Sequence, residues 1–164
     1  RSEVQQINIC ILAVGKVKER FYQTGIAHYA IRVKPYCNLK INEISEAKWR
    51  DKGQFSVKNA LQEEAAALGR YIRKEAHLIA LAAEGRKMTS EELAFYLERL
   101  LIAGQAKVDF IIGGPSGLDE GIKKMADLCL SLSNLTFPHR MVRLILLEQL
   151  YRSFKIIRGE PYHK

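Results

Sequence analysis

The chain has 164 residues, of which 48% are hydrophobic and 27% are charged, and its formal net charge is +8. These values are typical of one globular domain with an ordinary core, and no apolar run approaches the ~20 residues that a membrane-spanning helix needs. The positive charge favours a polyanionic partner such as nucleic acid, although a basic surface without such a partner fits it equally well. We expect the domain to cover residues 6–164, with residues 1–5 as a leader or remnant.

The three cysteines are Cys10, Cys37 and Cys129, and none of them belongs to a Cys-x-x-Cys pair or lies near a histidine cluster. This spacing argues against a zinc site and against a disulfide framework. We therefore expect small apolar thiols in a cytoplasmic protein, with no metal and no membrane partner.

Apolar periodicity predicts strands and helices that alternate along the chain. The predicted strands are 7–14, a segment around Leu39 and Ile41, 78–83, 108–112 and 128–132. The predicted helices are 19–33, 56–71, a segment that follows a capping box at Thr89 and Glu92, 119–128 and 138–155. We interpret 47–55 as a loop and 84–87 as a turn. Such an alternation is typical of an α/β fold with a mostly parallel sheet.

The last predicted helix is apolar around most of its circumference, which requires cover on more than one side. Its apolar residues are Met141, Val142, Leu144, Ile145, Leu146, Leu147, Leu150, Tyr151 and Phe154. One side can pack on the sheet. We expect the other side to meet a second subunit across a two-fold axis, and the alternative is burial within one monomer.

A glycine-rich segment, Ile111-Ile112-Gly113-Gly114-Pro115-Ser116-Gly117, joins a predicted strand to a predicted helix. Open α/β sheets bind ligands at the carboxyl ends of their strands, and glycine lets a ligand approach the backbone. The spacing fits neither a P-loop nor the dinucleotide fingerprint, and no Gly-x-Ser-x-Gly elbow is present. A tight turn without a ligand is an adequate alternative.

A second loop, 132–137, follows the next predicted strand and therefore belongs to the same edge of the sheet. Leu135 and Phe137 offer an apolar wall, and Ser133, Asn134 and Thr136 offer hydrogen-bonding groups. This combination suits a purine ring that carries a polar tail.

His139 follows Pro138 at the start of the last predicted helix, where the positive helix end favours a neutral imidazole. A neutral imidazole could position or deprotonate a substrate, but for an isolated histidine a structural role is the more common one. Arg152 follows Glu148 by four residues, which fits a plain ion pair.

The chain closes on Arg158-Gly159-Glu160-Pro161-Tyr162-His163-Lys164. Chain ends are usually frayed, so a solvated terminus is one interpretation. The ring of Tyr162 favours another, because aromatic rings stack on unpaired bases.

Four motifs in register carry a resemblance to a known family: Ile112-Gly113-Gly114-Pro115-x-Gly117, Leu132-Ser133-x-Leu135-Thr136-x-Pro138-His139, Leu150-Tyr151-Arg152 and Pro161-Tyr162-His163-Lys164. Together they resemble the small, single-domain pseudouridine N3-methyltransferases of bacterial 23S rRNA, the RlmH type of the SPOUT superfamily. The resemblance extends from the first predicted strand to the last residue. It implies a sheet sandwiched by helices whose C-terminal part threads a deep trefoil knot, which periodicity does not reveal.

The resemblance also implies a homodimer that uses S-adenosylmethionine and methylates N3 of a pseudouridine in helix 69 of 23S rRNA, within the assembled ribosome. The donor would contact Leu81, Gly113, Gly114, Leu132, Ser133, Asn134, Leu135, Thr136 and Phe137. The expected catalytic residues are His139, Arg152, Tyr162 and His163, and the expected RNA-binding residues are Arg140, Arg158 and Lys164. The alternatives are another SPOUT RNA methyltransferase, a non-catalytic ribosome-binding or RNA-binding protein, and a generic nucleotide-binding protein.

Overall fold

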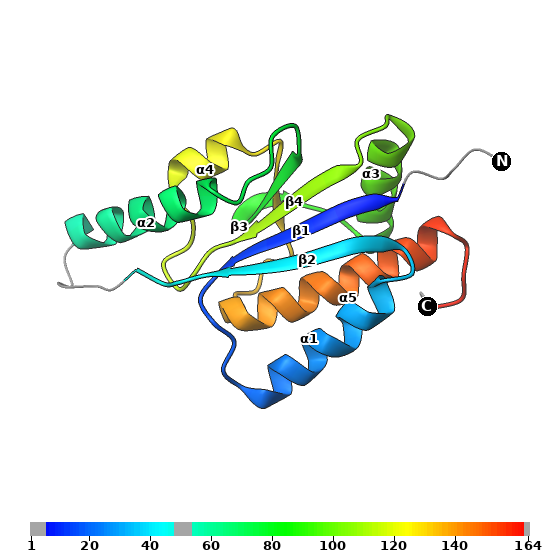
Figure 1. Ribbon diagram of the computed structural model, residues 1–164, viewed down its shortest axis with the longest axis horizontal. Helices are drawn as coiled ribbons and strands as arrows, with labels where there is room; N and C mark the ends of the chain where they lie inside the picture. Colours follow the sequence, from blue (N-terminus) through cyan, green and yellow to red (C-terminus); the bar gives the residue numbers. More distant parts are fainter. Residues whose placement is uncertain (1–5, 48–53, 163–164) are drawn as a thin grey trace.

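The computed structural model describes residues 6–47 and 54–162, which form a five-stranded parallel sheet flanked by helices (Figure 1). The strands are β1 (Ile7–Val14), β2 (Cys37–Ile44), β3 (His77–Lys87), β4 (Lys107–Ile112) and β5 (Leu128–Ser131). The helices are α1 (Arg20–Val33), α2 (Gln54–Gly69), α3 (Ser90–Ile102), α4 (Glu120–Met125) and α5 (His139–Ile157). The strand order is β2-β1-β4-β3-β5, and all neighbouring strands pair in parallel. The predicted α/β fold is therefore confirmed.

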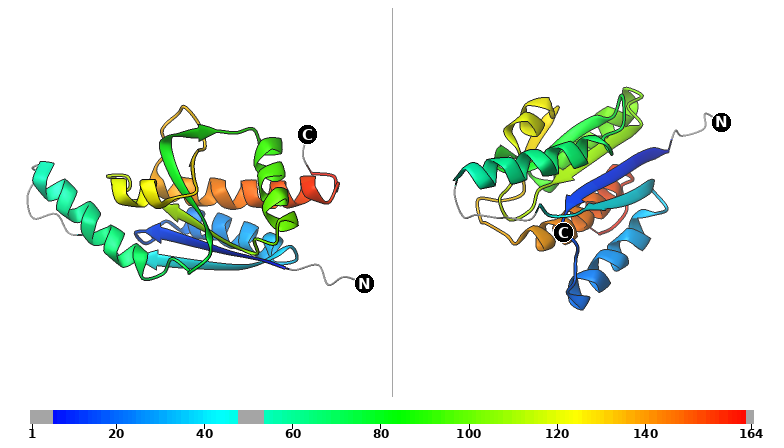
Figure 2. Two further views of the ribbon diagram at one scale, coloured as in Figure 1. Left: turned by 90° about the horizontal axis from the view of Figure 1, so that it is seen from above. Right: turned by 60° about the vertical axis from the view of Figure 1, so that its left-hand side comes forward.

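The two faces of the sheet bury alternate residues of β1, as the pleat of a strand requires. Ile9 and Ile11 pack in a cluster with residues of α1, α3 and α5, whereas Cys10 and Leu12 pack with residues of α2 and α4. Figures 1 and 2 show α1 and α5 on one side of the sheet and α2 and α4 on the other. A strand covered on both faces reads as a continuous apolar run, which explains the pattern of residues 7–14.

β3 differs from the prediction, because the segment 84–87 belongs to the strand and does not form a separate turn. Leu81 and Arg86 both pair with Leu130 of β5, so the residues between them leave the ladder. A Cβ on Gly85 would lie 2.7 Å from the carbonyl carbon of Cys129. Gly85 is thus required by the close passage of the β5 backbone. That passage is consistent with the knot that the resemblance implies, and the knot itself stays a prediction.

The start of α3 confirms the predicted capping box, and α4 is shorter than predicted. The Glu92 N–H donates to Thr89 Oγ1 at 3.1 Å, and the Thr89 N–H donates to Glu92 Oε2 at 3.0 Å. The helix predicted over 119–128 ends at Met125, because the backbone at Ala126 is extended. The Asp127 N–H then donates to the Leu78 carbonyl at 2.8 Å and leads the chain into β5.

α5 buries one face against the sheet and is flanked by α1 and α3. Its buried apolar residues are Leu146, Leu147, Leu150, Tyr151 and Phe154, whereas the predicted outer face is only partly buried. The second subunit that was expected on that outer face stays a prediction. Neither α5 nor another helix of the described residues has the length and apolar character needed to cross a membrane.

The three cysteines are free, as expected. Burial raises the pKa of Cys37 to about 12, so its thiol stays protonated at neutral pH and acts as an apolar core residue.

Candidate functional site

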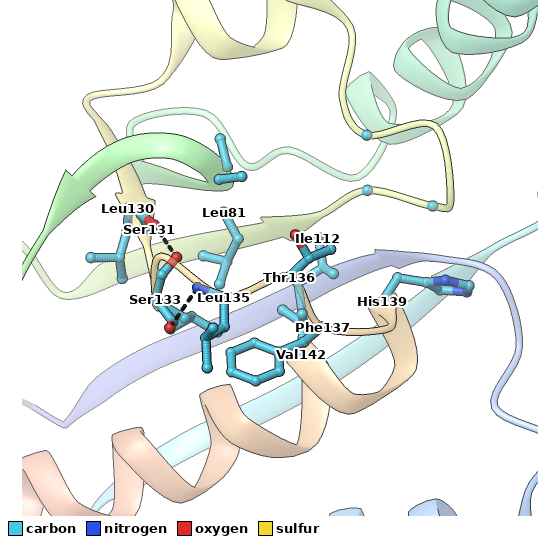
Figure 3. Close-up of a pocket in the computed structure, with 16 residues that line it drawn as sticks. Leu81, Ile112, Leu130, Ser131, Ser133, Leu135, Thr136, Phe137, His139 and Val142 are labelled. Carbon is cyan, nitrogen blue, oxygen red and sulfur yellow. Dashed lines mark hydrogen bonds between the residues drawn. The ribbon is translucent and has the colours of Figure 1, made fainter.

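A pocket with a cavity volume of about 160 Å³ lies where β4 and β5 end, and it is open to solvent on one side (Figure 3). Four segments form it: the middle of β3, the end of β4 with its glycine turn, the end of β5 with the loop that follows, and the start of α5. Its lining residues are Leu81, Ala82, Ala83, Ile112, Gly113, Gly114, Gly117, Leu130, Ser131, Leu132, Ser133, Leu135, Thr136, Phe137, His139 and Val142. The place is that of small-molecule sites in parallel sheets.

The structure brings together the residues that were expected to hold a small molecule, with the exception of Asn134, which is not among the lining residues. Their role in binding stays a prediction. Sequence analysis did not assign Ser131 and Val142 to the pocket, although their positions next to assigned residues would have allowed it. Ser131 is the last residue of β5, and Val142 lies one helical turn after the pocket residue His139.

The glycine turn has a conformation that requires glycine at two positions. Gly117 has a φ of +84°, and its N–H donates to the Gly114 carbonyl at 3.0 Å. A Cβ on Gly113 would lie 2.3 Å from the Gly117 carbonyl oxygen. The tight turn considered as an alternative is therefore present, and the same turn also forms a wall of the pocket.

The loop after β5 is held by two hydrogen bonds of its own serines (Figure 3). Ser131 Oγ donates to the Ser133 carbonyl at 3.0 Å, and the Leu135 N–H donates to Ser133 Oγ at 2.9 Å. Leu135 remains 72% exposed at the rim of the pocket. The loop thus offers an ordered backbone and an apolar side chain that a bound ring could cover.

His139 borders the pocket, but its ring points away from the other labelled residues (Figure 3). A Cβ on Gly15, the residue after β1, would lie 3.5 Å from His139 Nε2. Burial lowers the pKa of His139, and the charge of Arg140 lowers it further. The imidazole is therefore neutral at pH 7, as expected, although burial is the main cause. Its Nε2 is buried without a hydrogen-bond partner among the described residues.

Arg152 and Tyr162 meet each other near the C-terminal end of α5, away from the pocket. Arg152 Nη2 donates to Glu148 Oε1 at 2.6 Å, and its guanidinium carbon lies 4.9 Å from the centre of the Tyr162 ring. The Tyr162 hydroxyl donates to the same carboxylate oxygen at 3.2 Å. The ion pair expected from the spacing is confirmed, and it also anchors the tail. His163 lies outside the described residues.

Two of the cations expected to bind RNA lie near opposite ends of α5, Arg140 in its first turn and Arg158 just after its last residue. Arg140 pairs with Glu19, and the exposed Arg158 places its guanidinium carbon 4.8 Å from the centre of the Tyr36 ring. Lys164 lies outside the described residues. Their contacts with RNA stay predictions.

Comparisons with known proteins agree with the fold. A family model described as a predicted SPOUT methyltransferase matches residues 7–163. The chain belongs to the SPOUT methyltransferase family. This confirms the resemblance that the four motifs indicated.

Two relatives align with this SPOUT chain over their whole length. It is 45% identical to the ribosomal RNA large subunit methyltransferase H of Acetivibrio thermocellus and 43% identical to the protein of the same name from Bacillus pumilus. Each alignment covers 159 residues, which is 96% of this chain and 100% of the relative.

Two solved structures share the fold at low sequence identity. A probable methyltransferase from Bordetella pertussis Tohama I has a TM-score of 0.51 and 12% identity, with 91% of this chain and 93% of that chain covered. TrmJ from Z. mobilis ZM4 has a TM-score of 0.52 and 13% identity, with 97% of this chain and 72% of that chain covered.

The pocket of this SPOUT chain is mostly apolar, and among the described residues that line it only His139 has a titratable side chain. The walls can hold a flat ring, and the two loops can offer backbone groups to its polar edges. Proton transfer or charge stabilisation in the pocket would therefore have to involve His139 or groups from elsewhere.

Proposed function

We propose that this chain is an S-adenosylmethionine-dependent methyltransferase that methylates the RNA of the large ribosomal subunit in the cytoplasm. One observation carries the proposal. The glycine turn and the loop after β5 form one pocket, in a chain that is 45% identical over 159 residues to a ribosomal RNA large subunit methyltransferase H.

The chemistry of the pocket lining supports the choice of donor. Leu81, Leu132 and Phe137 supply apolar surface suited to an adenine ring. Gly113 and Gly114 carry no side chain, so a ligand can reach the backbone of the turn. Bound S-adenosylmethionine would supply a methyl group that is already activated by the positive sulfonium, so the reaction requires no metal.

The proposed target atom is N3 of a pseudouridine in helix 69, and the four motifs of the resemblance support it. N3 bears a proton at neutral pH, and it becomes nucleophilic when that proton leaves. Nearby cations stabilise the resulting anion and lower the pKa of N3, and Arg152 with the tail are the candidates for this role. The neutral His139, or His163, would accept the proton. Alignment of N3 with the methyl carbon would supply much of the acceleration.

A homodimer would bring the tail and Arg152 of one subunit close to the pocket of the other. Arg152 and Tyr162 hold each other at one end of α5, whereas the pocket lies at the other end. We infer that the tail of one subunit serves the pocket of its partner, across an interface that includes the outer face of α5.

The deciding experiment is tritium transfer from labelled S-adenosylmethionine to ribosomes with and without the pseudouridine. We expect labelling of the large-subunit RNA only where the pseudouridine is present. Labelling that ignores the pseudouridine would favour another RNA target. If calorimetry detects no donor binding, the chain is better explained as a non-catalytic RNA-binding protein.

A further inference from the structure

α5 carries one charged residue, Arg143, into the interior of the protein. Its side chain is only 2% exposed, and a buried guanidinium is costly unless it is paired and hydrogen-bonded. Nη1 donates to Glu43 Oε2 at 2.7 Å, and Nη2 donates to the Gly15 carbonyl at 3.0 Å. Arg143 therefore joins α5 to the end of β2 and to the β1–α1 loop, residues 15–19.

Further contacts hold the β1–α1 loop along its length. The Val17 N–H donates to Glu43 Oε2 at 3.2 Å, so the carboxylate held by the buried arginine also holds the loop. Gln23 Nε2 donates to the Val17 carbonyl at 2.8 Å. Glu19, at the end of the loop, pairs with Arg140 of α5. The loop is thus an ordered element although it lies at the surface.

The β1–α1 loop presents two lysines to the solvent. Lys16 and Lys18 are exposed, whereas Val17 and Glu19 between and after them are partly buried. Among the residues that the structure describes, neither ammonium has an ion-pair partner within 4.0 Å. Two cations are therefore held close together on a fixed backbone.

The loop begins beside His139, which is one of the residues that line the pocket. Gly15 packs against His139, because a Cβ added to Gly15 would lie 3.5 Å from His139 Nε2. Figure 3 shows that the His139 ring extends beyond the other pocket residues. Lys16 follows Gly15 directly. An RNA strand that places a base at the pocket would carry its phosphates past this rim.

We propose that the β1–α1 loop binds the RNA backbone at the mouth of the pocket. Lys16 and Lys18 contact phosphates, and Arg143 is a positioning residue that keeps the loop in place. Phosphate contacts fix the register of a nucleic acid, and a preordered loop loses less conformational freedom on binding. This proposal rests on the proposed function, since it requires an RNA substrate.

The test uses the full-length protein and ribosomes, with a matched control. The variant Lys16→Gln/Lys18→Gln is compared with Lys107→Gln/Lys124→Gln, which removes two exposed lysines at the amino end of β4 and on α4. We expect KM for ribosomes to rise about fivefold or more in the first variant alone. We also expect the slope of log KM against log salt to fall by about 1 to 2, because each lost phosphate contact removes roughly 0.7–0.9. The kcat and the affinity for S-adenosylmethionine should stay unchanged.

A KM and a salt slope equal to those of the control variant would overturn the proposal. A raised KM with an unchanged salt slope would also overturn it, since that result indicates a contact with ribosomal protein. Failure of the unaltered protein to bind the donor or to label ribosomes counts instead against the proposed function.

Arg143→Lys tests the positioning role, because a lysine cannot reach both Glu43 and Gly15 with a planar fork. We expect a higher KM, and no further rise when the two loop lysines are also replaced. Additive effects would show that Arg143 supports the fold only. If this variant does not fold, the lysine variants decide the proposal alone.

Discussion

His139 and Arg152 lie on the same helix, α5, and the thirteen residue steps from one to the other separate them by about 20 Å along the helix axis. His139 borders the pocket, whereas Arg152 packs on Glu148 and Tyr162. A straight helix cannot bring both side chains to the same reacting atom. Any chemistry that uses both therefore needs a second copy of the chain.

Mixed dimers test this conclusion. One subunit lacks the tail after Arg158, and the other has a pocket blocked by Gly113→Val. Each variant alone should be inactive. A 1:1 mixture that is unfolded and refolded together should recover roughly a quarter of the unaltered activity, because half of the dimers are mixed and each has one intact composite site. Methyl transfer to ribosomes is the readout, and continued inactivity of a mixture shown to be dimeric would count against the shared site.

Gly113→Ala tests the glycine turn more gently. The added Cβ would lie 2.3 Å from the Gly117 carbonyl oxygen, so the turn has to shift. We expect a loss of about 1–3 kcal/mol in unfolding free energy and at least a tenfold weaker affinity for S-adenosylmethionine. Gly69→Ala is the control, because nothing lies within 4 Å of its Cβ position and alanine is the better helix former. Unchanged donor affinity in Gly113→Ala would exclude the turn from the binding site.

Leu135→Ala separates binding from stability. Leu135 is 72% exposed at the pocket rim, so its removal should leave Tm within about 1 °C. A ligand that covers this side chain would lose about 1.5 kcal/mol, which corresponds to roughly tenfold in Kd by calorimetry. Ile102→Ala is matched, since Ile102 is 79% exposed at the end of α3. Equal Kd values for the two variants would argue against this contact.

The sequence allows the place of the pocket to be predicted, because parallel strands present their carboxyl ends at one edge of the sheet. Gly113 and Leu135 could therefore be assigned to one site although neither signal is specific alone. The path of β3 could not be predicted. In the sequence, Gly85 looks like a turn residue. The structure shows that glycine is needed there because the backbone of β5, more than forty residues later in the chain, passes too close for a side chain. Such long-range approaches leave no local pattern.

The buried ion pair of Arg143 could not be predicted from the sequence either. A cation within an apolar stretch of a helix is usually interpreted as a solvated position, because a buried charge is rare without a partner. The partner here is Glu43, which is 100 residues away in the chain. Only the fold brings the two together, so sequence analysis singled out neither.

Removal of the charge of Glu64 should stabilise the folded protein at neutral pH. Burial raises the pKa of this carboxyl group, and the nearby Glu46 and Glu63 raise it further. A carboxyl group with a raised pKa stabilises the fold below its unfolded pKa of 4.5, and this contribution is lost as the pH rises through the folded pKa. At neutral pH, Glu64→Gln should therefore gain about 1 kcal/mol, or roughly 2–4 °C in Tm.

Thermal unfolding at neutral pH and below about pH 4.5 measures this effect, because the gain should vanish at the lower pH. Glu75→Gln, at an exposed position between α2 and β3 that does not act on Glu64, is the control. A Glu64→Gln variant that is less stable at neutral pH would show that favourable contacts of the charged carboxylate, such as the Ala47 N–H at 3.4 Å from Oε1, outweigh the cost of its burial.

His139 should cause the opposite pH dependence. Burial and the charge of Arg140 lower its pKa from 6.5, so folding favours the neutral imidazole. The resulting stability is fully present above the unfolded pKa of 6.5 and is lost as the pH falls through the lower, folded pKa. His139→Gln removes this dependence, so its disadvantage against the unaltered protein should shrink between about pH 7.5 and about pH 5.5.

Denaturant unfolding at both pH values gives this difference directly, and His28→Gln, at an exposed position of α1, serves as the control. The variant His139→Gln also tests the role of this residue in the reaction. If His139 accepts the proton of N3, His139→Gln should lower kcat strongly and leave the affinity for S-adenosylmethionine nearly unchanged. If kcat is retained while the pH dependence of stability disappears, His139 is a structural residue, and the proton acceptor has to be sought in the tail.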